Sequence, residues 1–461
     1  MNIVAPLLAG AVGAGALIYS YYRGRNMQYM FKRTLKNLDL VKTLRKGVPE
    51  YSPTIYLPSG YLKTLSNFQM ADNPEYSREV IGVTYGGQVA LDHYRPKRKL
   101  AAQTSSISAE VLIKNISEKL NLNSKGQPTN RPKDQRQQDL AVEDQEPDSD
   151  VNSQKPPLIL VIPGFGTDST HEYIYKTVQL LASEESQKFD VCVFNQKGMG
   201  NLPFKGTDLL GYWNIRDLEA VILHLSKTYS DIHLLGFSVG ANLLQTFLSD
   251  MWDKKRETEN PEIFSAKWRP YTRNVDKIEL LDRIVSSACV SPIYNFEATC
   301  RNISSKAWLN PVLNSKYMSI IEKNIQYDEF KMALDKNSFD LQELKKLKTF
   351  RELNGYLIRK GLRMHDMDEA LEVISPWQNL ANVHTPMLCI SSLDDVLVDN
   401  YHVPVESAFT NEDFLLILVG SGGHISYSHG WTNENWSVLC AQKYFQEKQN
   451  QKRRLIWSAA I

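Results

Sequence analysis

The chain has 461 residues, with 53 lysines and arginines against 52 aspartates and glutamates, and 42% of its residues are hydrophobic. These values are typical of a globular protein with one large domain and additional segments. The near-zero net charge excludes a strongly basic nucleic-acid-binding protein, so no nucleic-acid partner is expected. The sequence has no C-x-x-C pair, no cluster of metal-ligand residues and no glycine-rich phosphate loop, so we expect neither a metal nor a cofactor.

Residues 1–22 are predicted to form an N-terminal transmembrane anchor. Residues 3–22 carry no charge and are just long enough to cross the hydrocarbon core of a bilayer as a helix. Basic residues follow at once, namely Arg23, Arg25, Lys32, Arg33 and Lys36. The positive-inside rule therefore predicts a single-pass membrane protein whose remaining chain lies in the cytosol. A cleaved signal peptide is the alternative, but no basic segment precedes the apolar run.

Residues 23–47 predict a basic amphipathic helix next to the membrane. Hydrophobic side chains recur three or four positions apart, and lysines and arginines lie between them. The hydrophobic positions are Phe31, Leu35, Leu38, Val41 and Leu44. Such a helix is suited to an anionic membrane surface. The other interpretation is a helix packed on the folded body of the protein.

The folded domain is predicted to begin with strands within residues 48–96. Residues 80–85 and 88–94 have strand-like composition and flank Gly86-Gly87, which predicts a hairpin. Residues 97–155 then become rich in Gln, Asp, Lys and Pro and have almost no aromatic side chains. That composition predicts a disordered insertion.

From residue 156 onward, short apolar runs alternate with helical segments. The runs cover 158–162, 189–195, 232–235, 281–290, 387–391 and 414–419. A continuous apolar run is typical of a strand buried on both faces, so the alternation predicts a doubly wound, mostly parallel sheet of the α/β class. The first part of this core spans 156–291 and the second spans 381–446. Residues 447–461 are predicted to be a C-terminal tail.

Residues 292–380, between the two parts of the core, are predicted to form a helical cap. They are helical by pattern and carry many large apolar side chains, among them Trp308, Tyr317, Met318, Phe330, Phe339, Phe350 and Tyr356. The segment interrupts the core on the side where the strands end, which is where a cap over a site would lie. The alternative is a set of helices that only cover the sheet.

A Gly-x-Ser-x-Gly pattern lies between the predicted strand at 232–235 and an amphipathic helix. Gly236 and Gly240 allow strand and helix to approach closely, and Ser238 is presented from a strained turn as the candidate nucleophile. The amide of Val239 lies at the N-terminus of the helix, where it can donate to an anion. An inert serine in a tight turn is the alternative.

A serine hydroxyl becomes a good nucleophile only when a base takes its proton and a carboxylate orients that base. Asp394 and Asp395 follow one late core strand, and His424 follows the last one in a glycine-rich loop. Both loops leave the carboxyl ends of strands, the edge at which sheets of this kind place their sites. The order serine, acid, histidine is the one expected for this elbow, so we predict His424 as the base rather than the nearby His429.

The second donor of an oxyanion hole is predicted in Pro163-Gly164-Phe165-Gly166, directly after the first core strand. The amide of Phe165 would act together with that of Val239 on the negative charge that develops on an attacked carbonyl oxygen. The alternative is a glycine turn of purely backbone importance.

Taken together, these motifs resemble the AB hydrolase superfamily, and in particular its membrane-anchored family four of lipases, phospholipases and medium-chain ester synthases. The resemblance covers roughly residues 50–96 and 156–445. It rests on Gly-Phe-Ser-Val-Gly-Ala-Asn-Leu from Gly236, the turn at 194–200, Leu393-Asp394-Asp395, Gly422-Gly423-His424, the segment 59–65 and Leu91-Asp92.

The resemblance implies an α/β-hydrolase fold and a serine esterase or lipase that acts on lipid esters through an acyl-enzyme. Ser238 would attack the ester, His424 would transfer the proton and Asp395 would orient the imidazole. Asp395 fits the Asp-x-x-Val turn that usually carries the acid in this fold, whereas Asp394 is expected to face its own loop and accept backbone amides.

The sequence departs from the family pattern at several positions. Tyr61 and Lys63 replace the usual His and Gln, and Val396 stands where proline usually follows the paired aspartates. The His-x-x-x-x-Asp motif of acyltransferase relatives is absent from the sequence. Acyl transfer to an alcohol, giving medium-chain esters, remains one alternative, and a non-catalytic membrane scaffold is the other.

Overall fold

The computed structural model describes residues 26–54, 64, 69–72, 74–94, 156–183, 189–206, 214–259, 277–337, 339–362, 364–431 and 434–459. The predicted anchor at 1–22 and the predicted insertion at 97–155 lie outside these residues. Within the described ranges, no helix combines the length and the apolar character needed to cross a bilayer.

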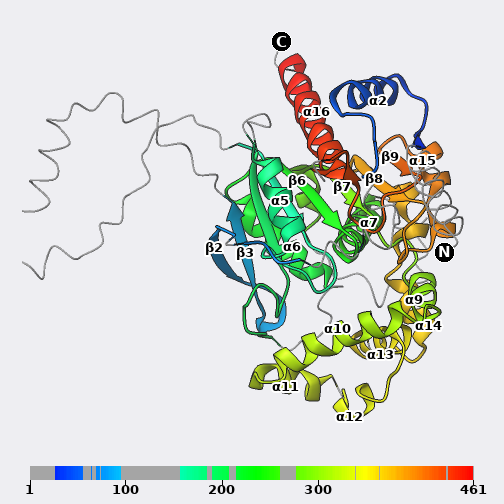
Figure 1. Ribbon diagram of the computed structural model, residues 1–461. Coiled ribbons are helices and arrows are strands. Elements are labelled where there is room, and N and C mark those ends of the chain that lie inside the picture. The colour runs from blue at the N-terminus through cyan, green and yellow to red at the C-terminus, as the bar shows by residue number, and fades with distance from the viewer. Residues whose placement is uncertain are drawn as a thin grey trace, which may run out of the picture. The chain divides into compact units, whose positions relative to one another are not determined.

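A nine-stranded sheet lies at the centre of the fold (Figure 1). The strands are β1 (Met27–Met30), β2 (Ser77–Gly82), β3 (Gln88–Tyr94), β4 (Leu158–Ile162), β5 (Asp190–Asn195), β6 (Ile232–Phe237), β7 (Ile284–Val290), β8 (Met387–Ser392) and β9 (Phe414–Val419). Their order across the sheet is β1-β9-β8-β7-β6-β4-β5-β3-β2. Strands β4 to β9 pair in parallel, and β3 and β1 join them antiparallel on either side. This confirms the predicted doubly wound, mostly parallel sheet.

Helices cover both faces of the sheet. They are α2 (Leu35–Gly47), α5 (Glu172–Leu181), α6 (Ile215–Ser226), α7 (Val239–Glu259), α15 (Val405–Thr410) and α16 (Trp436–Ala459). Leu158, Leu160 and Ile162 of β4 pack into a cluster with residues of α6 and α7. The alternate residues Ile159 and Val161 pack into a second cluster with residues of α2, α5 and α16. The strand is therefore buried on both faces, as its continuous apolar run predicted.

The predicted hairpin forms, because Ser77–Gly82 and Gln88–Tyr94 pair antiparallel. The predicted helix at 23–47 is wrong in its first part, because residues Met27–Met30 form strand β1 and the helix begins only at Leu35. Four residues without a clear alternation give little strand signal. Strand β1 pairs with β9, and the carbonyl of Asn26 accepts a hydrogen bond of 2.7 Å from the amide of Gly420. Residue 26 therefore lies at the carboxyl edge of the parallel strands.

Helix α2 begins at Leu35 and packs on the protein body through one face only. Leu40, Val41 and Leu44 are buried against the second cluster. Leu35 and Leu38 are exposed, at 84% and 46% of their full accessible area. The helix thus packs on the folded body, while the first turn leaves apolar side chains in the solvent.

The cap segment forms six helices that gather at one end of the sheet (Figure 1). They are α9 (Phe296–Ser304), α10 (Leu309–Asn324), α11 (Asp328–Lys336), α12 (Leu341–Leu344), α13 (Phe350–Leu362) and α14 (Met367–Val373). Their apolar residues share one cluster with Val239, Leu397 and Val398, which belong to the core. The helices therefore pack against the loops at the carboxyl ends of the strands, where the site was predicted.

Residues 447–461, predicted as a C-terminal tail, are helical as far as Ala459, because α16 continues to that residue; the side chains at 453–458 are exposed. Two polar side chains near the start of this part, Gln449 and Lys452, bind the folded body. Asp231, just before β6, accepts hydrogen bonds from Gln449 Nε2 at 2.6 Å and Lys452 Nζ at 2.7 Å. His233 of β6 is held between Ser286 Oγ at 2.8 Å and Gln449 Oε1 at 3.0 Å.

Burial lowers the pKa of His233 to about 4, although the hydrogen bond to Gln449 opposes the shift. The unfolded chain therefore takes up a proton at this residue before the folded chain does. The stabilisation by neutral His233 is complete above its ordinary pKa of 6.5 and is lost as the pH falls from 6.5 through 4.

We expect the free energy of unfolding to fall on acidification between pH 6.5 and 4, with a contribution from His233 of up to about 1.4 kcal/mol per pH unit. In urea unfolding, His233→Gln should weaken this pH dependence. The exposed His365→Gln is the matched control and should leave the slope as it is. An unchanged slope in His233→Gln would show that another group carries the pH dependence.

Candidate active site

The candidate nucleophile Ser238 stands in a strained turn between β6 and α7. Its φ is +53°, a left-handed conformation that residues other than glycine rarely adopt. A Cβ at Gly236 would lie 2.6 Å from the Cα of Ala241, and one at Gly240 would lie 2.4 Å from the carbonyl oxygens of Ile162 and Pro163. Strand and helix are thus too close for any side chain at either glycine, as the sequence predicted.

The structure brings Ser238, His424 and Asp395 into one line. Ser238 Oγ lies 2.7 Å from His424 Nε2, and His424 Nδ1 lies 2.8 Å from Asp395 Oδ2. A carboxylate only accepts hydrogen bonds, so Nδ1 carries the proton and Nε2 is left to accept from the serine hydroxyl. Ser238 and His424 are 6% and 4% exposed, so the chemistry would take place away from bulk water.

Asp395 is oriented by the turn that it begins. Its Oδ1 accepts the amides of Leu397 at 2.8 Å and Val398 at 3.1 Å, which leaves Oδ2 for the imidazole. This is the arrangement expected of an aspartate at the start of a tight turn.

Asp394 contacts a different partner from the one predicted. Within its own segment it accepts a hydrogen bond of 2.6 Å from Ser392 Oγ, but the backbone amides that it accepts belong to the loop that carries the histidine. Its Oδ1 accepts the amides of Gly422 and Gly423, both at 2.8 Å, and its Oδ2 accepts the hydroxyl of Ser421 at 2.6 Å. The aspartate next to Asp395 therefore fixes the position of the turn before His424.

Two further hydrogen bonds place the backbone around His424. Its amide donates to Thr64 Oγ1 at 3.0 Å, and the amide of Ile425 donates to Ser291 Oγ at 3.1 Å. His429 does not join the group, since its Nδ1 accepts the amide of Ser52 at 3.1 Å. The choice of His424 over His429 agrees with this geometry.

The predicted oxyanion donors belong to two segments that both lie next to Ser238. Val239 is the first residue of α7, so its amide has no carbonyl partner within the helix. Gly164, next to Phe165, is close to the serine, because a Cβ added to it would lie 3.3 Å from Ser238 Cβ. The loop that carries Phe165 is therefore adjacent to the nucleophile.

The far end of this loop is held by Asp92, which is fully buried. Asp92 Oδ2 accepts hydrogen bonds from Ser169 Oγ at 2.5 Å and from Asn195 Nδ2 at 2.8 Å. The amide of Ser169 in turn donates to Asn195 Oδ1 at 2.9 Å. Arg78 neutralises the carboxylate through two hydrogen bonds of 2.7 Å. This paired charge links β2, β3 and β5 to the oxyanion loop.

Cap helices contact the loops of both the acid and the oxyanion donor. Lys306 Nζ donates to the carbonyl of Val396 at 2.7 Å, and Asn302 Nδ2 donates to that of Leu397 at 2.8 Å. On the other side, the ring of Phe165 packs on Tyr317 and Phe350, with centroids 4.9 and 5.9 Å apart. A movement of the cap would therefore disturb both loops.

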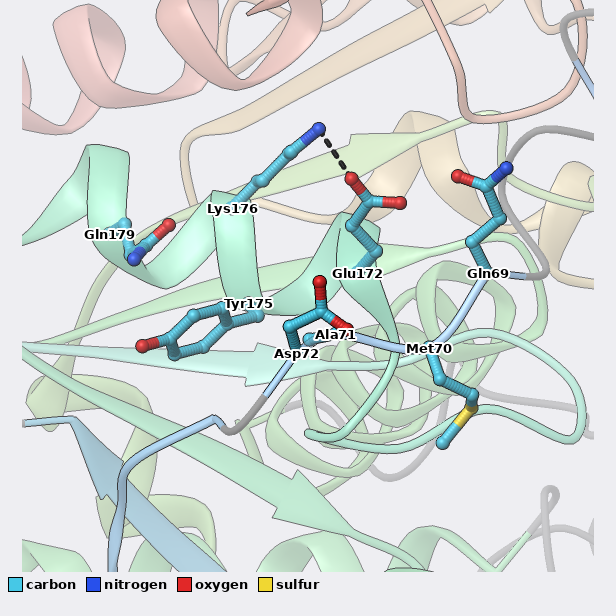
Figure 2. A pocket seen from close by; sticks show the side chains of 8 residues that line it. All are labelled: Gln69, Met70, Ala71, Asp72, Glu172, Tyr175, Lys176 and Gln179. Carbon is cyan, nitrogen blue, oxygen red and sulfur yellow. Dashed lines mark ion pairs between the residues drawn. The ribbon is translucent and has the colours of Figure 1, made fainter.

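A separate surface pocket of about 630 Å³ lies between residues 69–72 and α5 (Figure 2). Its lining residues are Gln69, Met70, Ala71, Asp72, Glu172, Tyr175, Lys176 and Gln179. Figure 2 shows Lys176 paired with Glu172, at 2.6 Å. This pocket contains none of the predicted site residues and no nucleophile, so it is not the candidate active site. In the described part of the chain, no three metal-ligating side chains come together.

The sequence patterns did not identify several residues around the site. Thr64, Tyr173, Ser291, Asn302 and Lys306 each contact a catalytic loop, but they come from segments far apart in the chain. Single threonines, tyrosines or lysines carry no motif signal. Only Thr64 lay in a segment that the family resemblance had marked.

Comparison with known proteins gives relatives at low identity. No family model matches the chain. Phospholipase ABHD3 from Mus musculus is 25% identical over 283 residues, which cover 61% of this chain and 60% of the mouse protein. Monoacylglycerol lipase from Saccharomyces cerevisiae is 21% identical over 426 residues, 87% of this chain and 82% of the yeast protein. The chain is thus similar, at low identity, to proteins named as a phospholipase and a lipase, and its own mostly parallel sheet and Ser238–His424–Asp395 line have the arrangement of an α/β-hydrolase fold.

Two solved structures match this chain at low TM-scores. An esterase from Pyrococcus furiosus has a TM-score of 0.40 at 13% identity, covering 81% of this chain and 94% of the esterase. A membrane phospholipase A has a TM-score of 0.38 at 12% identity, covering 90% and 98%. These values are too low to support an argument about function. The match to the ABHD3 relatives covers about three fifths of their length.

The contacts of the two aspartates predict different outcomes for their amide variants. Asp395→Asn should lower kcat on the order of ten-thousandfold with the fold intact, because the imidazole would be held in the wrong tautomer. Asp394→Asn should lower the melting temperature and reduce kcat far less, because it loosens the turn at 421–423. Ester hydrolysis and thermal unfolding of both variants test this. A larger loss of kcat in Asp394→Asn, at an unchanged melting temperature, would reverse the roles.

Proposed function

We propose that this protein is a serine hydrolase that cleaves carboxylic esters of lipids through an acyl-enzyme. The observation that carries the proposal is the line from Ser238 Oγ to His424 Nε2 to Asp395 Oδ2, with distances of 2.7 and 2.8 Å, at a strained elbow. Strain at a serine that also contacts a correctly oriented imidazole is typical of a nucleophile rather than of a structural turn.

In the first half of the reaction, Ser238 Oγ attacks the ester carbonyl carbon while His424 Nε2 takes the hydroxyl proton. The carbonyl oxygen becomes an oxyanion, to which the amides of Phe165 and Val239 donate. The imidazolium that forms is stabilised by Asp395, whose carboxylate remains ionised. His424 then gives its proton to the leaving alcohol, and the acyl group stays on Ser238.

In the second half, His424 takes a proton from a water molecule, and the resulting hydroxide attacks the acyl-enzyme. The same two amides stabilise the second oxyanion. As it collapses, the bond to Ser238 Oγ breaks, His424 returns its proton to that oxygen, and the carboxylic acid is released. Every group that acts in these steps belongs to the chain itself, so the proposal needs no cofactor.

Two observations support a lipid as the substrate. The curated relatives are named as a phospholipase and a monoacylglycerol lipase. In addition, the apolar cluster of the cap extends to Val239, which follows Ser238, and to Leu397 and Val398, which lie in the turn that Asp395 begins. An acyl chain that leaves water for such surroundings gains about 0.8 kcal/mol per buried methylene.

Two alternatives differ from hydrolysis at identifiable steps. In acyl transfer, the same acyl-enzyme is opened by an alcohol instead of water, so product esters would form when alcohol is supplied. A non-catalytic membrane scaffold would form no acyl-enzyme. The oriented Ser238–His424–Asp395 line favours an enzyme over a scaffold, because a non-catalytic protein does not require these three side chains to be aligned.

We also propose that residues 3–22 anchor the protein in a membrane. Their lack of charge and their length support this. The carbonyl of Asn26 is bonded to Gly420, four residues before His424, so the described chain begins at the same edge of the sheet as the site. An anchor that ends at residue 22 would hold this edge within a few residues' reach of the bilayer.

The substrate class is tested with p-nitrophenyl esters of increasing chain length. We expect kcat/KM to rise from acetate toward medium chains, by up to about fourfold per buried methylene. A fluorophosphonate probe should label the wild type and fail to label Ser238→Ala, which is also the inactive control for hydrolysis. A steady fall of kcat/KM with chain length would refute the assignment of a lipid substrate. Absence of labelling in the wild type would refute the assignment as a serine hydrolase.

The anchor is tested by alkaline carbonate extraction of membranes. The full-length protein should remain in the pellet, and a truncated protein that begins at Asn26, which keeps β1, should be released. As a control, full-length Val12→Lys/Ala16→Lys should also be released, because each lysine costs about 2.5–3.5 kcal/mol near the centre of a spanning helix. Release of the unaltered full-length protein would exclude an integral anchor.

A further inference from the structure

The loop that carries Phe165 contains a closed set of hydrogen bonds that the mechanism above does not use. The amide of Gly164 donates to Tyr173 Oη at 3.0 Å. Thr167 Oγ1 donates to the carbonyl of Gly164 at 2.9 Å, and the amide of Thr167 donates to the same carbonyl at 3.3 Å. The hydroxyls of Tyr173 and Thr167 are 2.7 Å apart. Both side chains are buried.

The direction of each hydrogen bond follows from these contacts. The proton of the Thr167 hydroxyl is used on Gly164, so the bond between the two hydroxyls must be donated by Tyr173. The result is a chain from Gly164 N–H to Tyr173, from Tyr173 to Thr167, and from Thr167 back to Gly164 C=O. Hydrogen bonds in such a head-to-tail series strengthen one another in a buried environment. Burial also raises the pKa of Tyr173 to about 12, so its hydroxyl remains a donor at neutral pH.

These contacts fix the orientation of the peptide bond between Gly164 and Phe165. The bond is planar and trans, so the Phe165 N–H points opposite to the Gly164 carbonyl. Since that carbonyl is held toward Thr167, the Phe165 N–H is turned away from Thr167. Without the two hydroxyls, this peptide could rotate and present its carbonyl oxygen, an acceptor that repels an oxyanion.

Tyr173 contacts both the donor loop and the residue that precedes the nucleophile. It lies in the first turn of α5, and its ring packs edge-on against Phe237 with centroids 5.5 Å apart. Phe237 directly precedes Ser238. The position of Gly164 beside Ser238 and the packing of Tyr173 on Phe237 therefore couple the donor loop to the elbow.

We propose that Tyr173 and Thr167 are positioning residues for the oxyanion hole, whose hydroxyls hold the Phe165 amide toward the oxyanion formed at Ser238. This inference rests on the proposed serine-hydrolase function. It assigns to the two hydroxyls an effect on the transition state and not on the binding of substrate, because the oxyanion exists only after attack.

Tyr173→Phe removes the hydroxyl and keeps the ring that packs on Phe237. With p-nitrophenyl butyrate we expect kcat to fall about ten- to a hundredfold, which is less than the fall in kcat when an oxyanion donor is removed altogether. KM should stay within twofold. Affinity for an alkyl trifluoromethyl ketone, which forms an oxyanion-bearing adduct with the serine, should fall by a similar factor. Affinity for the product butyrate, which forms no such adduct, should be unchanged.

Tyr229→Phe is the matched control. It also removes a buried tyrosine hydroxyl, which donates to Asp190 Oδ2 at 2.9 Å beside the amino ends of the strands. It should lower the melting temperature by a similar amount and leave kcat and ketone affinity unchanged. A merely structural role of Tyr173 would make the two variants alike.

Thr167 gives an independent pair of variants should Tyr173→Phe fail to fold. Thr167→Val removes the hydroxyl at nearly constant volume and should lower kcat, whereas Thr167→Ser keeps the hydroxyl and should retain most of the rate. Equal kcat in Thr167→Val and wild type, or a loss confined to KM, would overturn the inference. A wild type that neither hydrolyses esters nor reacts with fluorophosphonate at Ser238 would overturn the proposed function instead.

Discussion

The close approach of β6 and α7 at Ser238 is the constraint on which the rest of the site depends. Gly236 and Gly240 have no room for a Cβ, and Ser238 adopts a φ of +53° that it would avoid in a free chain. Strain of this kind persists only where the surroundings enforce it. Here the enforcement comes from the sheet, since the amide of Ser238 donates to the carbonyl of Val290 on β7 at 2.9 Å. The serine is thus fixed by the scaffold, and the other functional groups must be brought to it.

Those groups lie on loops. Buried hydrogen bonds fix each loop, because a loop has no regular backbone pairing of its own. Asp394 binds the turn before His424, and Asp395 is fixed by the turn that it begins. The donor loop is held at one end by Tyr173 and Thr167. Because an unsatisfied buried polar group is costly, each of these networks has few alternative arrangements. This gives flexible segments the precision that the chemistry requires.

The cap links these loops to one another. Asn302 of α9 and Lys306, just after that helix, donate hydrogen bonds to the acid loop, and aromatic residues of the cap pack on Phe165 of the donor loop. The apolar cluster of the cap also includes residues beside the nucleophile and the acid. Under the proposed function, a cap of this kind would provide apolar surroundings for an acyl chain and would influence the geometry of the catalytic groups at the same time. In a lipase of the proposed type, binding of substrate under the cap and alignment of the site would therefore be coupled.

The sequence by itself determined the sheet, the elbow and the residues Ser238 and His424, because apolar periodicity and a glycine turn are local signals that each segment carries alone. The preference for Asp395 over Asp394 needed the family register, and only the structure gave Asp394 its role at the histidine loop. Tertiary contacts also decided what local patterns could not. Strand β1 exists because β9 offers it an open edge, and α16 continues past residue 447 because Asp231 binds Gln449 and Lys452. The hydrogen bonds of Tyr173 and Thr167 to Gly164 likewise join a loop to a helix. In each case the deciding hydrogen bond joins groups whose proximity is set by the packed fold and by no pattern in the sequence.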